Sequence, residues 1–286
     1  MWWSTLAGKL ERAAVLDPVV GVAAGVVNTV LPRGKVKDGL HGRWLGHPLH
    51  PLLVAVPIGM WSGALLLDLT GGPASRVAAR RLVGAGVLMV APSAASGLAD
   101  WSELGAFDKP KRVGLVHALA NVTSTVLFGA SWLARRRDDQ EKGRTLALAG
   151  TAGLVVSGYL GGHLAYSQGV GMNRNADEQK EPVGWTDAAA VSDVGEGQLH
   201  QVDVDGQAVV LARAGGELYA MGATCSHYGA SLAEGELAED GCLVCPWHGS
   251  RFRLRDGSVA QGPATAPQLS YRVRTRGERV EVQARP

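Results

Sequence analysis

The sequence predicts two unlike domains: an N-terminal all-α domain of four transmembrane helices and a C-terminal small all-β domain. Four long apolar runs lie between residues 52 and 166, whereas runs of alternating polar and apolar residues fill the end of the chain. The charge changes at the same place. Residues 1–166 carry 17 Lys and Arg against 10 Asp and Glu, and residues 167–286 carry 11 against 16.

Each apolar run is about long enough to cross the hydrocarbon core of a bilayer. Small residues at four-residue spacing, such as Gly153, Ser157 and Gly161, allow another helix to approach closely in lipid. A soluble bundle of buried helices is the alternative, but the short connections and nearly uncharged runs favour membrane spans. The runs are LLVAVPIGMWSGALLLDLT (52–70), LVGAGVLMVAPSAASGLA (82–99), VGLVHALANVTSTVLFGASWLA (113–134) and TLALAGTAGLVVSGYLGGHLAY (145–166).

The remaining segments complete the expected organisation. PVVGVAAGVVNTVL (18–31) is apolar but too short for a span, so we expect a helix lying at the membrane interface. SQGVGMNRNADEQKEPVG (167–184) is polar and lacks apolar periodicity, as in a linker. The predicted parts are an N-terminal segment (1–39), a four-span domain (40–166), the linker (167–184) and the β domain (185–286).

Two hairpins are predicted in the β domain. QVDVDG alternates polar and apolar residues and stops at Asp205-Gly206, and YRVRTRGERVEVQ alternates on both sides of Arg276-Gly277. Alternation interrupted by such a turn dipeptide is typical of antiparallel strands.

The three cysteines all lie between residues 225 and 245 of a long chain, which favours metal ligation over a disulfide framework. CSH offers Cys225 and His227, and CPWH offers Cys245 and His248. Two sulfurs and two nitrogens could bind zinc. However, one cysteine and one histidine on each loop better suit a two-iron cluster with both cysteines on one iron and both histidines on the other.

CSHYGASL, CPWHGSRF and GPATAPQLSYRV resemble the cluster loops and proline loop of a Rieske [2Fe–2S] protein, over residues 185–286. The resemblance implies that Cys225 and Cys245 ligate one iron of a [2Fe–2S] cluster and that His227 and His248 ligate the other. It also implies that Pro263 and its neighbours cover the cluster.

Departures from the family bear on the reduction potential. Ala230 and Trp247 replace the cysteines that form a disulfide in Rieske proteins of quinol-oxidising complexes, and Phe252 replaces a tyrosine. The resemblance implies that Ser250 donates a hydrogen bond to a cluster sulfur. With one such donor and no disulfide, we expect a potential below the top of the family range of roughly −150 to +300 mV. Cys242 is expected to be a buried structural residue.

Two functions are excluded by what the sequence lacks. A Rieske oxygenase needs two histidines and a carboxylate for a further iron after the Rieske domain, but no histidine follows His248. We therefore do not expect the chain to be a terminal ring-hydroxylating oxygenase. Neither half concentrates basic side chains with stacking aromatics, so a nucleic-acid partner is not expected.

HGRWLGHPLHPLLVAVPIGMW, together with GLADW, RVGLVHALAN and GYLGGHL, resembles an uncharacterised family of four-helix membrane proteins with a GHPLHP motif, over residues 40–166. The resemblance implies architecture only. If the spans alternate in direction, His47, His50, His117 and His163 gather at one membrane edge, and an even number of spans returns the chain to that edge before the Rieske domain. Such imidazoles could hold haem b or a quinone. Alternatively they cap a turn and bond between helices.

Two further expectations concern charge. Asp68, at the far end of the first span, is expected to pair with Arg76, Arg80 or Arg81. The loops opposite the histidines hold eight Lys and Arg, and the segments flanking the spans on the histidine side hold nine, so the distribution of basic residues does not assign the membrane side of the Rieske domain.

The sequence thus predicts a multi-pass cell-membrane protein that carries single electrons through a [2Fe–2S] cluster. Its partners would be the lipid bilayer and either a quinone or a redox protein that docks at the His227 and His248 edge. The alternatives are a quinol- or haem-linked membrane oxidoreductase module and a protein whose cluster is structural or senses redox state.

Overall fold

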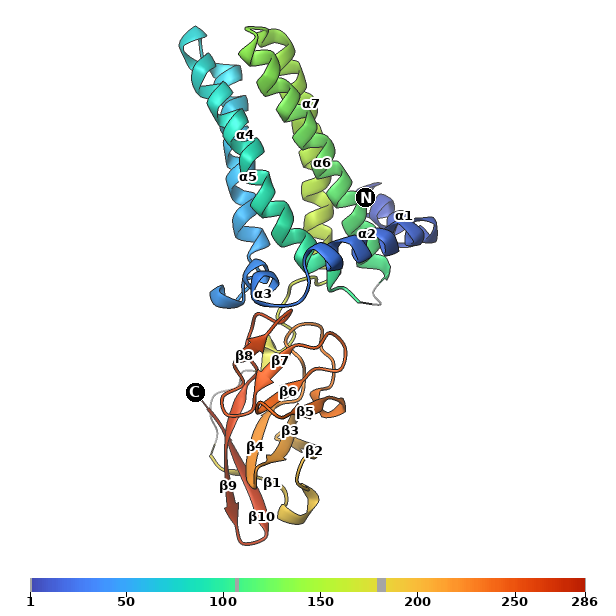
Figure 1. Ribbon diagram of the computed structural model, residues 1–286, viewed down its shortest axis with the longest axis vertical. Helices are drawn as coiled ribbons and strands as arrows, with labels where there is room; N and C mark the ends of the chain where they lie inside the picture. Colours follow the sequence, from blue (N-terminus) through green and yellow to red (C-terminus); the bar gives the residue numbers. More distant parts are fainter. Residues whose placement is uncertain (1, 106–107, 179–183, 286) are drawn as a thin grey trace. The chain divides into compact units, whose positions relative to one another are not determined.

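The computed structural model describes residues 2–105, 108–178 and 184–285, and divides the chain into two compact units (Figure 1). The helical unit comprises residues 1–32 and 49–170, and the β unit comprises residues 33–48 and 171–286. Residues 33–48, which lie just before the first span, thus pack with the β domain. The boundaries predicted at residues 39 and 166 do not show this division. Residues 179–183 of the predicted linker lie outside the described residues.

Four long helices occupy the predicted spans. They are α4 (His50–Thr70), α5 (Arg76–Ser102), α6 (Asp108–Arg136) and α7 (Gln140–Gly162), and α7 continues into a π-helical turn over His163–Ser167. Helix α4 packs against α5, and α6 packs against α7. All four are long and apolar enough to cross a membrane, with only 17% to 28% of their most apolar windows buried by protein.

Two shorter helices of the helical unit precede the spans. Helix α2 (Asp17–Val30) occupies the expected apolar segment, whereas α1 (Trp2–Glu11) was not expected from the sequence. The two helices meet at a bend of 56° and together are also long and apolar enough to count as a fifth span. Arg112 of α6 holds both of them, because its guanidinium donates to the Asp17 carboxylate at 2.6 Å and to the Glu11 backbone carbonyl at 2.8 Å.

Small residues let α6 and α7 approach closely, as the glycine spacing predicts. A side-chain Cβ at Gly153 would lie 2.3 Å from Ser124 Oγ, and one at Gly161 would lie 3.1 Å from His117 Cε1. A larger residue at Gly153 would force the two helices apart.

Asp68 has a different partner from the one expected. Its carboxylate pairs with Arg135 of α6, with 2.8 Å between Oδ1 and Nη1, rather than with Arg76, Arg80 or Arg81. The Asp68 side chain is 8% exposed and that of Arg135 is fully buried. The sequence identifies the charges nearest along the chain, but the packing of α4 near the end of α6 selects the partner.

The β unit contains two sheets. The six-stranded sheet has the order β1-β10-β9-β4-β3-β2, and the four-stranded sheet has the order β5-β6-β7-β8. Figure 1 shows β7 and β8 at one end of this unit and the turn between β9 and β10 at the other. The strands are β1 (Thr186–Ala190), β2 (Leu199–Val204), β3 (Gln207–Ala214), β4 (Glu217–Gly222), β5 (Glu236–Ala238), β6 (Cys242–Val244), β7 (Arg251–Arg253), β8 (Val259–Gln261), β9 (Ser270–Arg276) and β10 (Arg279–Ala284).

Both predicted hairpins are present. Strands β2 and β3 are joined by Asp205 and Gly206, which have φ values of 52° and 79°. Two consecutive positive φ angles are those of a two-residue turn whose twist matches that of the flanking strands. Strands β9 and β10 pair antiparallel across the turn that contains Gly277.

Strand β3 is buried on both faces, because successive side chains point to opposite sides of a sheet. Val209 and Leu211 pack into one core cluster with Val280. Val210 packs into a second cluster, which contains Leu243 as well as both predicted cysteine ligands. The candidate metal loops are therefore anchored in the hydrophobic core.

The β unit also includes a short helix, α3 (Lys35–His41), followed by a 3₁₀ turn over Arg43–Leu45. Gly42, between them, adopts a left-handed conformation with φ of 88°, which ends the helix.

Candidate metal centre

Two loops carry the four predicted ligands. Cys225 and His227 lie in the loop between β4 and β5, and Cys245 and His248 lie in the loop between β6 and β7. Both loops belong to the β unit.

The first loop is a tight turn closed by backbone hydrogen bonds. The amide of Cys225 donates to the carbonyl of Ala230 at 2.9 Å, and the amide of Gly229 donates to the carbonyl of Cys225 at 2.8 Å. Gly229 has a φ of 77°, which a residue with a side chain rarely adopts.

The second loop repeats this turn. The amide of Cys245 donates to the carbonyl of Ser250 at 2.8 Å, and that of Gly249, with a φ of 69°, donates to the carbonyl of Cys245 at 3.0 Å. Gly229 and Gly249 are not among the site residues predicted from the sequence, although each glycine lies four residues after a predicted ligand cysteine.

The two cysteine sulfurs interact directly. The Cys225 thiol donates a hydrogen bond to Cys245, which raises the pKa of Cys225 and lowers that of Cys245 to about 6. Burial raises both pKa values. Backbone N–H groups lower them, those of His227 and Tyr228 at Cys225 and those of Trp247 and His248 at Cys245. Each sulfur therefore faces donors that stabilise a thiolate, the form that ligates metal.

The two imidazoles also form a pair. The ring centroids of His227 and His248 lie 5.0 Å apart with the rings nearly perpendicular. His227 is half-buried, whereas His248 is only 6% exposed. The sequence predicts an exposed edge formed by both histidines. Of the two, only His227 is partly accessible to solvent.

The four predicted ligands form a sulfur pair and an imidazole pair, which fits the two ends of a cluster with cysteines on one iron and histidines on the other. In the described part of the chain, no three His, Cys, Asp or Glu side chains are grouped so that they could hold a single metal ion.

A third loop, the proline loop (residues 262–268), is bonded to both ligand loops. The amide of Ala264 donates to the Ser250 hydroxyl at 3.0 Å, and the Ser226 hydroxyl donates to the carbonyl of Ala266 at 2.7 Å. Ser250 is fully buried and Pro263 is buried. The proline loop is thus positioned to cover a cluster and to orient the Ser250 hydroxyl.

Other residues around the loops have simple structural roles. Phe252 is fully buried in β7 and packs in the core beneath the ligand cysteines. Cys242 is buried in β6, as expected, and burial raises the pKa of its thiol. Trp247, in contrast, is 51% exposed.

Two family models match the chain. One is the Rieske [2Fe-2S] domain, over residues 184–275, and the other is a predicted membrane protein family, DUF2231, over residues 46–174. The 3-phenylpropionate/cinnamic acid dioxygenase ferredoxin subunit of Shigella flexneri is 39% identical over 90 residues, which are 32% of this chain and 84% of that subunit.

The chain belongs to the Rieske [2Fe–2S] family. Its Rieske domain is fused to a DUF2231 domain, and its cofactor is a [2Fe–2S] cluster, which when bound supplies one-electron redox chemistry. Among solved structures, the ferredoxin of carbazole 1,9a-dioxygenase from Nocardioides aromaticivorans is similar. It has 31% sequence identity and a TM-score of 0.33, and the match covers 36% of this chain and 97% of that ferredoxin.

Two histidines of the DUF2231 domain, His50 and His117, bond across the helical unit. His50 and His117 each place Nδ1 2.9 Å from a backbone carbonyl, those of Ser93 and Ser157. Because carbonyls only accept, Nδ1 carries a proton in both rings. Nε2 of His117 lies 3.1 Å from the side-chain amide of Asn121.

The other two predicted histidines differ. His163 Nε2 lies 2.8 Å from the Glu11 carboxylate, and Nδ1 of His47, which belongs to the β unit, lies 3.1 Å from the Pro48 carbonyl. These contacts agree with the alternative in which the histidines bond within a turn or between helices. Binding of haem or quinone at His50 and His117 stays a prediction.

Replacing Ser250 by alanine should lower the reduction potential of the Rieske cluster. The buried hydroxyl accepts from the Ala264 amide, which leaves its own proton to donate toward the cluster. Loss of a donor to cluster sulfur destabilises the reduced state. A redox titration monitored by electron paramagnetic resonance (EPR) measures the shift. Ser231→Ala, which removes a hydroxyl bonded to Gln201, is the control and should leave the potential unchanged.

Proposed function

We propose that the chain is a membrane-anchored Rieske electron carrier that exchanges single electrons with a redox protein docking beside Trp247. The observation that carries this proposal is the pairing of two thiols and two imidazoles on matching loops, with the His227 and Trp247 side open to solvent. A cluster held in this way reacts at its exposed side while its cysteine end stays in the core.

The open side has the composition of a docking surface. Trp247 is 51% exposed, and Pro246 beside it is also exposed. The Trp247 ring lies 6.4 Å from the ring of the ligand His248. Exposed tryptophans are enriched among residues that dominate binding energy at protein interfaces.

Two observations support anchoring in a membrane. The helical unit exposes large apolar side chains along its spans, among them Leu66, Leu88, Val126 and Val155, which are 59% to 76% exposed. In addition, residues 33–48 precede the spans and residues 171–286 follow them, yet both belong to one compact unit. The chain must therefore return to the side of the membrane from which it entered, and four crossings of the membrane would do this.

The first test is low-temperature EPR of the purified full-length protein before and after dithionite, with an optical spectrum of the same sample. The proposal expects a rhombic signal that appears only on reduction and averages below the free-electron g value. A colourless, EPR-silent protein that contains zinc, from cells able to build clusters, would exclude electron transfer. A haem band after haem-replete expression would instead support the haem hypothesis for His50 and His117.

Trp247→Ala should slow reduction of the cluster by a redox protein. With a flavin-containing ferredoxin reductase and NADH as the probe, we expect the second-order rate constant to fall about tenfold or more, as for loss of an aromatic interface anchor. The EPR spectrum and potential should not change, because Trp247 is not a ligand. Tyr166→Ala, which removes an 86% exposed aromatic from the helical unit, is the control. Equal rates for both variants would place docking elsewhere.

A further inference from the structure

Helix α3 buries an unusual number of polar side chains. Lys37 and His41 are each 2% exposed and Asp38 is 7% exposed, although the helix spans only Lys35–His41. Lysine and aspartate are almost never this buried unless they are paired. The buried face of α3 therefore makes specific polar contacts within the β unit.

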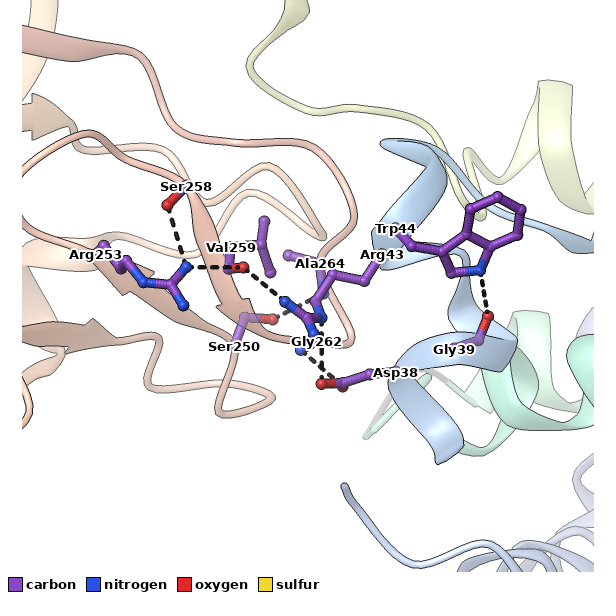
Figure 2. Close-up of polar contacts among 10 residues, drawn as sticks. All are labelled: Asp38, Gly39, Arg43, Trp44, Ser250, Arg253, Ser258, Val259, Gly262 and Ala264. Atoms are coloured by element: carbon purple, nitrogen blue, oxygen red, sulfur yellow. Dashed lines mark hydrogen bonds and ion pairs between the residues drawn. The ribbon is translucent and has the colours of Figure 1, made fainter. Parts of the chain in front are cut away.

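Asp38 of α3 and Arg43 of the following 3₁₀ turn contact the strand and loop that lead over the cluster site (Figure 2). The Asp38 carboxylate accepts a hydrogen bond from the backbone amide of Gly262 at 3.0 Å and pairs with Arg43 at 3.3 Å. Arg43 in turn donates to the carbonyl of Val259 at 3.2 Å. We call Asp38 and Arg43 the α3 clamp.

Gly262 allows the clamp to approach. A Cβ at this position would lie 3.2 Å from Asp38 Oδ1 and 3.5 Å from His41 Cδ2. The first distance is tighter than nine in ten Cβ contacts in proteins, so even alanine would require the carboxylate to shift by a few tenths of an ångström. The absence of a side chain at Gly262 is thus part of the contact.

The clamp is connected to the cluster site through two residues. Gly262 bonds to Asp38, and Ala264, two residues later, donates its amide to the Ser250 hydroxyl at 3.0 Å. Ser250 is fully buried and lies in the second ligand loop. Figure 2 shows Ser250, Ala264, Gly262 and Asp38 in this order from the sheet to α3.

We propose that Asp38 is a positioning residue, through which α3 holds the proline loop in place, orients the Ser250 hydroxyl and so sets the reduction potential of the cluster. The segment that precedes the first membrane span thereby controls the redox centre of a domain that follows it by more than a hundred residues. The inference rests on the cluster of the proposed function but not on any partner.

Charge and positioning have opposite effects, which makes the proposal testable. Removing a negative charge near a cluster stabilises the reduced state and raises the potential. Losing the orientation of the Ser250 hydroxyl removes a hydrogen bond to cluster sulfur and lowers the reduction potential. Asp38→Asn removes the charge but keeps an oxygen that can accept from Gly262, whereas Asp38→Ala removes both.

The experiment compares midpoint potentials of the full-length, cluster-loaded protein by EPR-monitored titration. We expect Asp38→Ala to have a lower potential than Asp38→Asn. When Ser250→Ala is added to both variants, the difference between their midpoint potentials should vanish, because Asp38 acts through the Ser250 hydroxyl. Hydrogen exchange of the Gly262 amide should accelerate in Asp38→Ala and stay near the wild-type rate in Asp38→Asn.

Gly262→Ala provides a second variant that changes no charge and leaves Asp38 in place. It should lower the potential and speed exchange of the residue 262 amide, in the same direction as Asp38→Ala. Equal potentials for Asp38→Ala and Asp38→Asn, or a difference that persists without the Ser250 hydroxyl, would overturn the inference and leave the electron-carrier function intact. Absence of the rhombic EPR signal from the reduced wild-type protein would instead overturn the proposed function.

Discussion

Replacing Cys245 by alanine should leave the purified protein without its [2Fe–2S] cluster. Cys245 faces Cys225 in the core and receives N–H groups from its own loop, as expected of a thiolate that ligates one iron of the cluster. Iron content should fall from about two per chain to near zero, and the rhombic EPR signal should disappear. Colorimetric iron analysis and EPR of the reduced protein measure both.

Cys242→Ala is the matched control, because it removes the remaining cysteine. Cys242 is as buried as Cys245 but lies in β6, where its thiol interacts with Asp240 and Arg251 and not with the ligand loops. The cluster should persist in this variant with an unchanged spectrum. Retention of iron by Cys245→Ala together with loss by Cys242→Ala would show that the ligand assignment is wrong.

Asp68→Ala should strongly destabilise the helical unit. The substitution leaves the fully buried Arg135 guanidinium without the carboxylate that it contacts at 2.8 Å. Removing one partner of a buried ion pair costs about 3–5 kcal/mol, because the remaining charge stays desolvated. Unfolding of the full-length protein in detergent or nanodiscs, followed by helical circular dichroism, should show a lower midpoint.

Two variants separate this effect from a general loss of charge. Arg137→Ala removes an exposed arginine just beyond the end of α6 and should leave the unfolding midpoint unchanged. The double variant Asp68→Leu and Arg135→Met replaces the pair by apolar groups and should recover most of the lost stability. If Asp68→Ala unfolds at the same midpoint as Arg137→Ala, the pair does not stabilise the unit.

The sequence was sufficient to predict elements whose pattern is local. Four apolar runs of about twenty residues correspond to α4 to α7, because length and composition alone decide whether a helix can span lipid. The Asp205-Gly206 hairpin was predictable because its dipeptide tolerates two positive φ angles. The metal loops were predictable because their chemistry requires cysteine and histidine at short spacing.

Contacts between distant segments could not be predicted in this way. Neither the pairing of Asp68 with Arg135 nor that of Asp38 with Gly262 leaves a pattern in the sequence, since the partners are 67 and 224 residues apart. A helical pattern indicates which face of a helix is apolar but not which helix or loop packs against it. The Asp38 contact, moreover, uses a backbone amide, which every residue but proline offers.

The composition of the β unit also has a consequence for how the protein is made. Residues 33–48 leave the ribosome before residues 49–170 of the helical unit, and the strand and loop that contact α3 follow only after them. At about 5–20 residues per second, the synthesis of the rest of the chain takes some tens of seconds. The Asp38 contact with Gly262 therefore cannot form until residue 262 has been synthesised. A fragment beginning at residue 184 would lack α3, and by the proposal above its cluster would have a different reduction potential from that of the intact protein.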